Sequence, residues 1–109
     1  MDLRGAEKKA LVELRKKIKG LLGDRLSGFI LFGSRARGDY DKESDIDLAI
    51  IVRGLSRELK KEILDEVAET EFNHLTPLSV FVISEDDFDR LKKRERRIAL
   101  DIEREGIPL

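Results

Sequence analysis

The apolar residues of the chain recur in two patterns, one typical of amphipathic helices and one typical of buried strands. Residues 2–22 have apolar side chains at steps of three and four, with lysines and arginines between them, which predicts a helix that stops at Gly23-Asp24. The apolar positions of this helix are Leu3, Ala6, Ala10, Leu14, Ile18 and Leu21. Continuous apolar runs at 29–32, 46–52 and 78–83 predict three short buried strands.

Two further helical segments are predicted between and after these strands. Ser56 can cap a helix that ends before Thr76-Pro77. The apolar stripe expected on this helix is Leu59, Ile63, Val67 and Phe72. Ser84, with Asp87 three positions later, predicts the start of a last helical segment that runs to about residue 105. Its expected inward contacts are Phe88, Leu91, Ile98 and Ile102.

The order of these elements defines the expected fold class. Helix, strand, strand, helix, strand and helix predict a small α/β (α+β) fold, with a mixed sheet of three or more strands flanked by helices. Residues 33–45 join the first two strands and have room for one short helical turn. The length of 109 residues, without repeats or a low-complexity linker, predicts a single domain over residues 1–109.

Composition narrows the classes of function. Charged residues make up 41% of the chain, but 22 basic and 23 acidic residues nearly cancel, so we expect no strong attraction to nucleic acid or to a membrane surface. The absence of cysteine excludes disulfides, thiolate zinc sites and cysteine nucleophiles. No apolar stretch approaches the roughly 20 residues that span a bilayer, and no signal peptide is evident, so a cytoplasmic protein is expected.

The dipeptide Gly33-Ser34 stands where the first predicted strand must turn. Glycine allows close approach of the backbone to a ligand, and backbone N–H groups with a serine hydroxyl can bind phosphate oxygens. Arg35 and Arg37 follow and have the donor geometry that suits a polyphosphate. Taken alone, the dipeptide is more typical of an ordinary turn, and either arginine is at least as typical of a solvated surface.

The pair Asp45 and Asp47 opens the second predicted strand. Residues two apart on a strand share a face, with Cα atoms roughly 7 Å apart. Two such carboxylates repel each other unless a cation lies between them, and Mg²⁺ prefers oxygen ligands and leaves room for substrate phosphates. The alternative is a solvated strand entry at which Asp45 merely ends the polar loop.

Together these residues resemble a known signature. Gly33-Ser34, a ten-residue spacer and Asp45-Ile46-Asp47 are similar to the motif of the polymerase-beta-like nucleotidyltransferase superfamily, and the longer runs 32–39 and 44–48 resemble its minimal nucleotidyltransferase branch. The resemblance implies that Gly33 and Ser34 contact the phosphates of a nucleoside triphosphate, expected to be ATP. It also implies that Asp45 and Asp47 bind Mg²⁺ and that Arg35 and Arg37 assist at the phosphates.

The chain departs from this family at one position. Active members have a third carboxylate on the next strand, and the best alignment puts Ser79 there, a residue that is a poor metal ligand and a poor general base. Three explanations stay open. Another acid, such as Glu71, Glu85 or Asp86, reaches the site, or a partner completes it, or the protein binds nucleotide without efficient transfer.

The leading hypothesis is therefore a Mg²⁺-dependent nucleotidyltransferase that transfers AMP from ATP to a hydroxyl of an acceptor, which a partner protein could provide. The resemblance also implies an alternative, because minimal nucleotidyltransferases are often paired with a helical HEPN-domain protein as toxin and antitoxin. In that case the chain would neutralise its partner with weak or no transferase activity. The apolar faces of the first and last helices could also serve a homo-oligomer.

Overall fold

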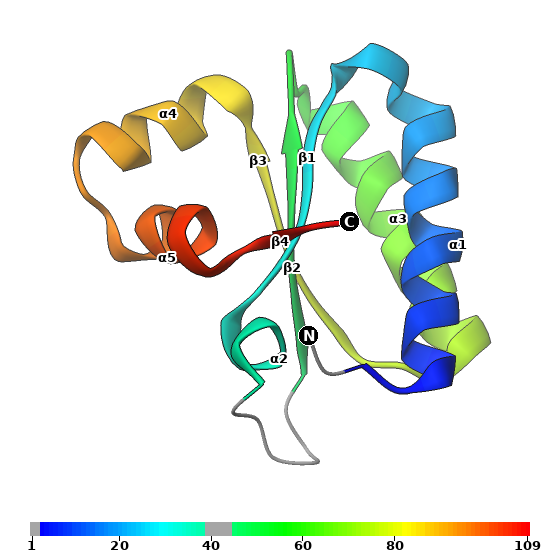
Figure 1. Cartoon of the computed structure of the whole chain (residues 1–109). Coiled ribbons are helices and arrows are strands. Elements are labelled where there is room, and N and C mark those ends of the chain that lie inside the picture. Colours follow the sequence, from blue (N-terminus) through cyan, green and yellow to red (C-terminus); the bar gives the residue numbers. More distant parts are fainter. Residues whose placement is uncertain (1–2, 39–44) are drawn as a thin grey trace.

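A four-stranded mixed sheet forms the centre of the computed structural model, which describes residues 3–38 and 45–109 (Figure 1). The strands are β1 (Leu26–Phe32), β2 (Ile46–Val52), β3 (Leu78–Ser84) and β4 (Ile107–Pro108). Their order in the sheet is β3-β2-β1-β4. β2 pairs antiparallel with β1 and parallel with β3, while β4 pairs antiparallel with β1. The predicted fold class is confirmed.

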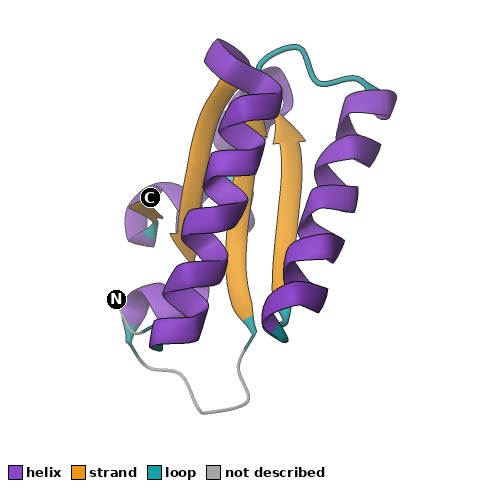
Figure 2. Cartoon of the chain, turned by 90° about the vertical axis from the view of Figure 1, so that its right-hand side faces the viewer, coloured by secondary structure: helices purple, strands orange, loops and turns teal. Residues whose placement is uncertain are grey.

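Helices cover both faces of this sheet. α1 (Gly5–Leu22) and α3 (Arg57–His74) lie side by side on one face, as Figures 1 and 2 show from two directions. On the other face lie α4 (Glu85–Lys93) and α5 (Arg97–Glu105), with the short α2 (Gly33–Arg37) near the end of β1. A single 3₁₀ turn, η1 (Gly23–Arg25), links α1 to β1.

The central strand β2 is buried on both faces of the sheet, which explains why its sequence is almost continuously apolar. Ile46, Leu48 and Ile50 point into the main core under α1 and α3. Ala49 and Ile51 point the other way, into a second cluster under α4 and α5. Because a strand buried on both faces has no solvent side, the run lacks the usual alternation of polar and apolar residues.

The structure corrects three details of the predicted elements. The strands begin or end up to three residues beyond the predicted limits, and β4 was not predicted at all. The last segment forms two helices rather than one. The break lies at residues 94–96, where Glu95 has a left-handed backbone with φ of 53°. The expected short helical turn after the first strand is confirmed as α2.

The predicted caps are confirmed, but the prediction of which side of each helix faces the core (its phase) is partly wrong. The hydroxyls of Ser56 and Ser84 accept hydrogen bonds from backbone N–H groups three residues later. Several side chains expected to face inward are exposed instead: Ala6, Leu21, Phe72 and Ile98. Their neighbours or turn-related residues occupy the core in their place: Leu11, Leu22, Thr70 and Ala99. The spacing of apolar residues allowed either phase, and packing against the sheet selected one.

A polar contact joins α1 to α3. The ring Nε2 of His74 hydrogen-bonds with the carboxylate of Glu13, and this bond lowers the pKa of Glu13. The only histidine of the sequence thus links two helices on the face of the sheet away from α4 and α5. None of the described helices combines the length and the apolar character that crossing a membrane requires.

Two isoleucines of α5 provide a matched test of the corrected phase. Ile102 is buried against the sheet and Ile98 is exposed, although both were expected to face inward. We expect Ile102→Ala to lower the free energy of unfolding by about 2–5 kcal/mol, because it leaves a cavity in a packed core. Ile98→Ala should cost less than about 1 kcal/mol. Urea denaturation followed by circular dichroism measures both, and equal losses would contradict the observed phase.

Candidate active site

The predicted site residues meet where three neighbouring strands have their ends. In the sheet register Asp47 lies opposite Phe32 of β1 on one side and opposite Ser79 of β3 on the other. Gly33 and Ser34 follow directly after Phe32 and begin α2. The two halves of the sequence motif, separated by the ten-residue spacer, are therefore adjacent in space. Asp39 and Ser44 of the longer motif lie outside the described residues.

Gly33 makes the closest approach in this arrangement. Its backbone has φ of 74°, in the left-handed region, and a Cβ atom at this position would collide with the carboxylate of Asp47. Both observations require glycine, the first because of backbone strain and the second because of space. The turn after β1 is thus fitted against the side chain of Asp47.

The two aspartates differ in environment. Asp45 is exposed just before β2, whereas Asp47 is half-buried on the strand. Burial raises the pKa of Asp47, and the nearby charge of Asp45 raises it further. A hydrogen bond from Ser79 and the charge of Arg37 act in the opposite direction without cancelling this rise. The carboxylates therefore repel each other, which is the electrostatic condition that a bound cation would relieve.

Arg35 is placed differently from a solvated surface residue. Its side chain is only 3% exposed, and its Nη1 donates to the Glu7 Oε1 of α1 at 2.8 Å. The same Glu7 oxygen accepts the backbone N–H of Arg4 at 2.7 Å. This buried ion pair attaches α2 to α1. The suggested contact of Arg35 with phosphate stays a prediction.

Arg37 lies at the other side of α2 and is half-exposed. Its Nη1 pairs with the Glu105 Oε2 at the end of α5, 2.9 Å away. Because its charge also acts on Asp47, Arg37 contributes positive potential at the aspartate pair. Its suggested phosphate contact likewise stays a prediction.

Ser79 occupies the position next to Asp47 at which a third carboxylate was sought. Of the acids proposed to replace it, Glu71 lies at the same end of the sheet, because its Oε2 accepts the Leu78 N–H at 3.0 Å. Glu85 and Asp86 begin α4 beyond the opposite end of β3, and Glu85 hydrogen-bonds there with Ser27. The suggestion that either of these two acids reaches the site is therefore wrong.

The donor set fits a magnesium ion that is shared with a nucleotide. Mg²⁺ in such sites is commonly held by one or two carboxylates and by substrate phosphates. Asp45 and Asp47 supply two carboxylates beside the turn at Gly33. Within residues 3–38 and 45–109, no group of three acidic or histidine side chains could hold a metal by itself. A magnesium ion held by these two carboxylates would take its other oxygen ligands from water or from a substrate.

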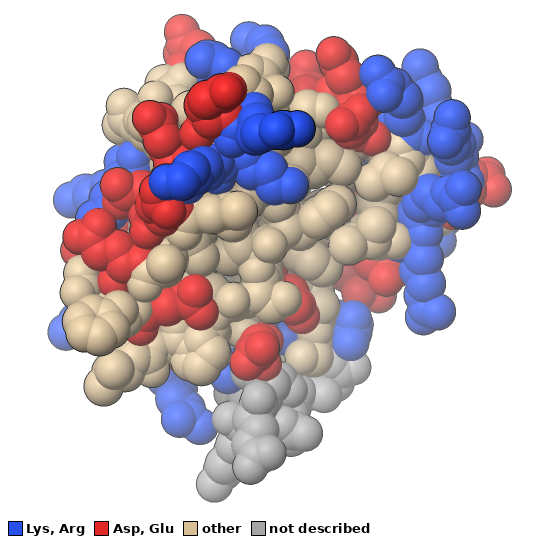
Figure 3. Space-filling view, turned by 180° about the vertical axis from the view of Figure 1, so that it is seen from behind, with Lys and Arg blue, Asp and Glu red and all other residues tan. Residues whose placement is uncertain are grey.

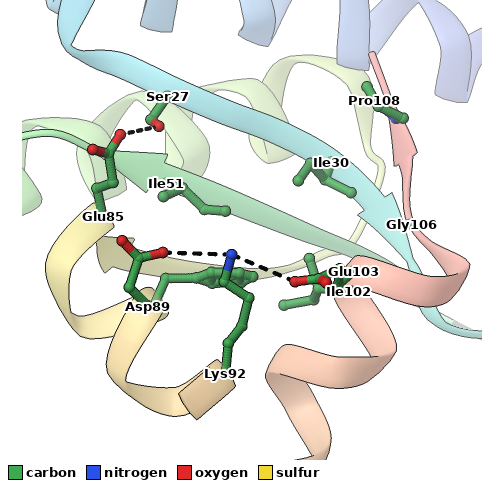
Figure 4. Close-up of a pocket in the computed structure, with 11 residues that line it drawn as sticks. Ser27, Ile30, Ile51, Glu85, Asp89, Lys92, Ile102, Glu103, Gly106 and Pro108 are labelled. Atoms are coloured by element: carbon green, nitrogen blue, oxygen red, sulfur yellow. Dashed lines mark hydrogen bonds and ion pairs between the residues drawn. The ribbon is translucent and has the colours of Figure 1, made fainter.

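A cavity of about 300 Å³ lies on the same face of the sheet but at its other end, between α4, α5 and β1 (Figure 4). Its polar groups are engaged with one another. Lys92 bridges Asp89 and Glu103 at 3.4 Å each, and Glu85 bonds Ser27. Ile51, near the far end of β2, lines this cavity and lies four positions from Asp47 along the strand. The cavity is therefore separate from the aspartate site.

Comparisons with known proteins identify the family of the chain. The sequence profile described as "Nucleotidyltransferase domain" matches residues 8–105, so the chain belongs to the nucleotidyltransferase domain family. A crystal structure described as that of "a putative nucleotidyltransferase from Sulfolobus solfataricus" superposes with a TM-score of 0.56 and 19% identity. The superposition covers 99% of this chain and 89% of that one. At this identity the likeness shows a shared fold.

Two curated relatives come from Methanocaldococcus jannaschii. The protein named "Putative protein adenylyltransferase MJ0141" is 45% identical over 56 residues, which are 51% of this chain and 57% of the relative. The protein named "Putative protein adenylyltransferase MJ0604" is 49% identical over 45 residues, 41% of this chain and 45% of the relative. The chain thus spans about half the length of the curated relatives that it matches.

Sequence reasoning missed two acids that position the site. Glu7 and Glu105 lie 28 and 68 positions from the arginines that they bind, on the first and last helices. Glu7 stands three residues after Arg4, as in a capping box, and that spacing was its only signal. Nothing in the sequence distinguishes Glu105 from the other charged residues of its helix.

The buried pair of Arg35 and Glu7 predicts a pH-dependent loss of stability. Burial raises the pKa of Glu7, but hydrogen bonds from Arg35 and Arg4 and their charges bring it below its ordinary value. A lowered folded-state pKa stabilises the protein above the unfolded pKa of about 4.3 and ceases to do so as the pH falls through the folded value. We expect Glu7→Gln to cost about 1–3 kcal/mol at pH 7, because a buried charged donor loses this acceptor.

Urea denaturation at pH 7 and at pH 3 measures this difference. The gap between wild type and Glu7→Gln should shrink at the lower pH, where Glu7 of the wild type becomes protonated. Glu62→Gln, at an exposed position of α3, is the control and should change stability by less than about 0.5 kcal/mol. A gap that stays constant with pH would contradict the pairing.

Proposed function

We propose that this protein transfers AMP from ATP to a hydroxyl group of a protein, in a reaction that requires Mg²⁺. Membership of the nucleotidyltransferase domain family supports the transfer of a nucleotidyl group. The names of the two relatives support the adenylyl group and a protein acceptor. Asp45 and Asp47 would hold Mg²⁺, and Gly33 with Ser34 would bind the phosphates next to it.

The observation that carries the proposal is the contact between Gly33 and Asp47. A phosphate turn and a metal ligand can act on the same triphosphate only when they are adjacent, and the register of β1 with β2 makes them so. The backbone of the turn can approach a phosphate oxygen because no side chain projects from Gly33. Ser34 adds a hydroxyl that can donate to the same phosphates.

In the proposed reaction an acceptor oxygen forms a bond to the α-phosphorus while the bond to the pyrophosphate oxygen breaks. When bound, Mg²⁺ supplies positive charge that orients the phosphates and stabilises the charge that develops on them. Arg37, which already acts electrostatically on Asp47, adds positive charge from the protein. The residues of the chain would thus position the phosphates and stabilise the charge that develops on them, which are the main tasks of a protein in phosphoryl-group transfer.

A second candidate function rests on Ser79. Its hydroxyl hydrogen-bonds the carboxylate of Asp47, and it is neither a strong metal ligand nor a base. A site with two carboxylates can bind nucleotide and Mg²⁺ yet transfer slowly. In that case the chain would act by binding a partner, as an antitoxin-like protein binds a HEPN-domain toxin.

Replacing both aspartates distinguishes the two functions. We expect Asp45→Asn/Asp47→Asn to lower transfer from α-labelled ATP by at least a hundredfold, because about 3 kcal/mol of electrostatic stabilisation is lost. Asp24→Asn, at an exposed position in η1, is the matched control and should transfer normally. The measurement is the label incorporated into a mixture of candidate acceptor proteins at millimolar Mg²⁺.

The result has a clear contrary outcome. The proposed activity would be contradicted if the wild-type protein does not bind ATP with Mg²⁺ in calorimetry and does not transfer label. A double variant that stays folded, no longer binds nucleotide and still neutralises a partner in cells would favour the binding function.

Ser79→Asp tests whether the site lacks only a third carboxylate. The new side chain would stand next to Asp47 in the register of β2 and β3, where it can bind metal and accept the proton of the attacking hydroxyl. We expect transfer to increase at least about tenfold, with tighter binding of Mg²⁺. Ser79→Asn, which has a similar volume without the charge, should show neither gain. A decrease in both transfer and Mg²⁺ affinity would contradict this assignment of the position.

A further inference from the structure

The two arginines of α2 are held in different ways. Arg35 is 3% exposed and reaches toward α1, where Glu7 accepts its hydrogen bond. Arg37 is half-exposed and reaches toward α5, where Glu105 accepts its hydrogen bond at 2.9 Å. Residues three apart on a helix are neighbours on its surface, so Arg37 lies beside Ser34 at the start of α2. Of the two arginines, Arg37 is therefore the one that is both accessible to solvent and next to the proposed phosphate turn.

The charge of Arg37 also acts on the aspartate pair. Burial is the main influence on the pKa of Asp47 and raises it, while the charge of Arg37 lowers it. The carboxylate of Asp47 in turn fills the space beside Gly33, where a side chain would not fit. The guanidinium of Arg37 is thus bonded to Glu105 and is at the same time within electrostatic range of the proposed metal and phosphate site.

Glu105 stands at the tightly packed end of α5. It is the last residue of that helix, and Gly106 after it donates its N–H to the carbonyl of Ile102 at 3.0 Å. A Cβ atom at position 106 would collide with that carbonyl and with the side chain of Ile30 on β1. Ile102 itself is buried against the sheet. The end of α5 therefore has little room to move, and Glu105 holds Arg37 from a fixed point.

An exposed ion pair needs more than its existence to be assigned a role. Basic and acidic side chains lie next to one another over much of the surface, as the view from behind shows (Figure 3). Such pairs usually contribute little to stability, because water already solvates both charges. What distinguishes the pair of Arg37 with Glu105 is its place. It joins α5 to the helix that begins with the proposed phosphate turn (Figure 1).

We infer that Glu105 is a positioning residue that orients Arg37 for the triphosphate of ATP. An unrestrained arginine side chain loses rotamer freedom when it binds a phosphate, and one that a carboxylate already holds loses less. The planar guanidinium has five N–H donors, so it can bind a carboxylate and a phosphate oxygen together. Glu105 thus acts on ATP through Arg37. This inference rests on the nucleotide site of the proposed function, although not on the transfer step.

Calorimetric titration with ATP and Mg²⁺, together with the rate of transfer, tests this role. We expect Glu105→Ala to raise the dissociation constant of ATP at least about fivefold and to change kcat less than about twofold, because ground state and transition state lose the same contact. Glu105→Gln keeps an oxygen that accepts from Arg37 and should stay within about twofold of the wild type. Glu103→Ala, two positions away on α5, removes an ion pair with Lys92 instead and is the matched control.

An exchange of the two charges separates positioning from simple attachment of α2 to α5. The double variant Arg37→Glu/Glu105→Arg can form the same ion pair in reverse, but it places a carboxylate where a guanidinium acted on Asp47. We expect it to bind ATP at least about tenfold more weakly than the wild type. Wild-type affinity in this double variant would overturn the inference, because attachment of the two helices would then be sufficient.

The remaining outcomes separate this inference from the proposed function. If Glu105→Ala binds ATP as tightly as the wild type, or if Glu103→Ala loses as much affinity, the inference is overturned and the proposed transferase is not. If Glu105→Ala weakens ATP binding to a protein that transfers no label, the inference is supported and the transfer is contradicted. A wild type that binds no ATP with Mg²⁺ would contradict both.

Discussion

The contact between the backbone of Gly33 and the carboxylate of Asp47 is the constraint on which the candidate site depends. β1 and β2 run antiparallel, so the end of one strand necessarily meets the beginning of the other. At that meeting point any side chain on residue 33 would occupy the space of the Asp47 carboxylate. Glycine therefore serves two purposes at once. It permits the left-handed turn into α2, and it leaves the space that the carboxylate of Asp47 occupies against the turn.

Two ion pairs join the turn to neighbouring helices, and Ala36 of α2 packs against the main core. Arg35 is buried and bound to Glu7 of α1, and Arg37 reaches Glu105 of α5. The five-residue α2 is too short to be stable alone, so these two ion pairs connect it to helices on opposite faces of the sheet. Such an arrangement favours a preformed site, because the groups that would meet the substrate are held by contacts that already exist in the protein.

The sequence was sufficient to predict the elements with strong periodicity and the motif with fixed spacing. Predictions failed for features that depend on packing between residues far apart in the chain. β2 was correct to the residue because a strand buried on both faces is apolar throughout. β4 consists of two residues with no pattern of their own, and it exists only because Gly106 brings the chain back beside Ile30. Phe72 was assigned to the core because α3 could be read in two phases. The role of Glu7 depends on a partner 28 residues away, which no local pattern reveals.

Ser79 limits how much of the family's reaction can be inferred for this chain from the resemblance. The register confirms that it stands beside Asp47, so the absence of a carboxylate there is a property of the site and not of the alignment. Two carboxylates that repel each other, one with a raised pKa, still favour a divalent cation with bound phosphates. They provide no evident base for the acceptor hydroxyl. Glu71, whose Oε2 accepts the Leu78 N–H, is the acid of the three considered that lies at this end of the sheet. The proposed function therefore has two separate requirements: binding of nucleotide and Mg²⁺, which the aspartate pair and the Gly33 turn would provide, and proton transfer from the acceptor, for which Ser79 is a poor base.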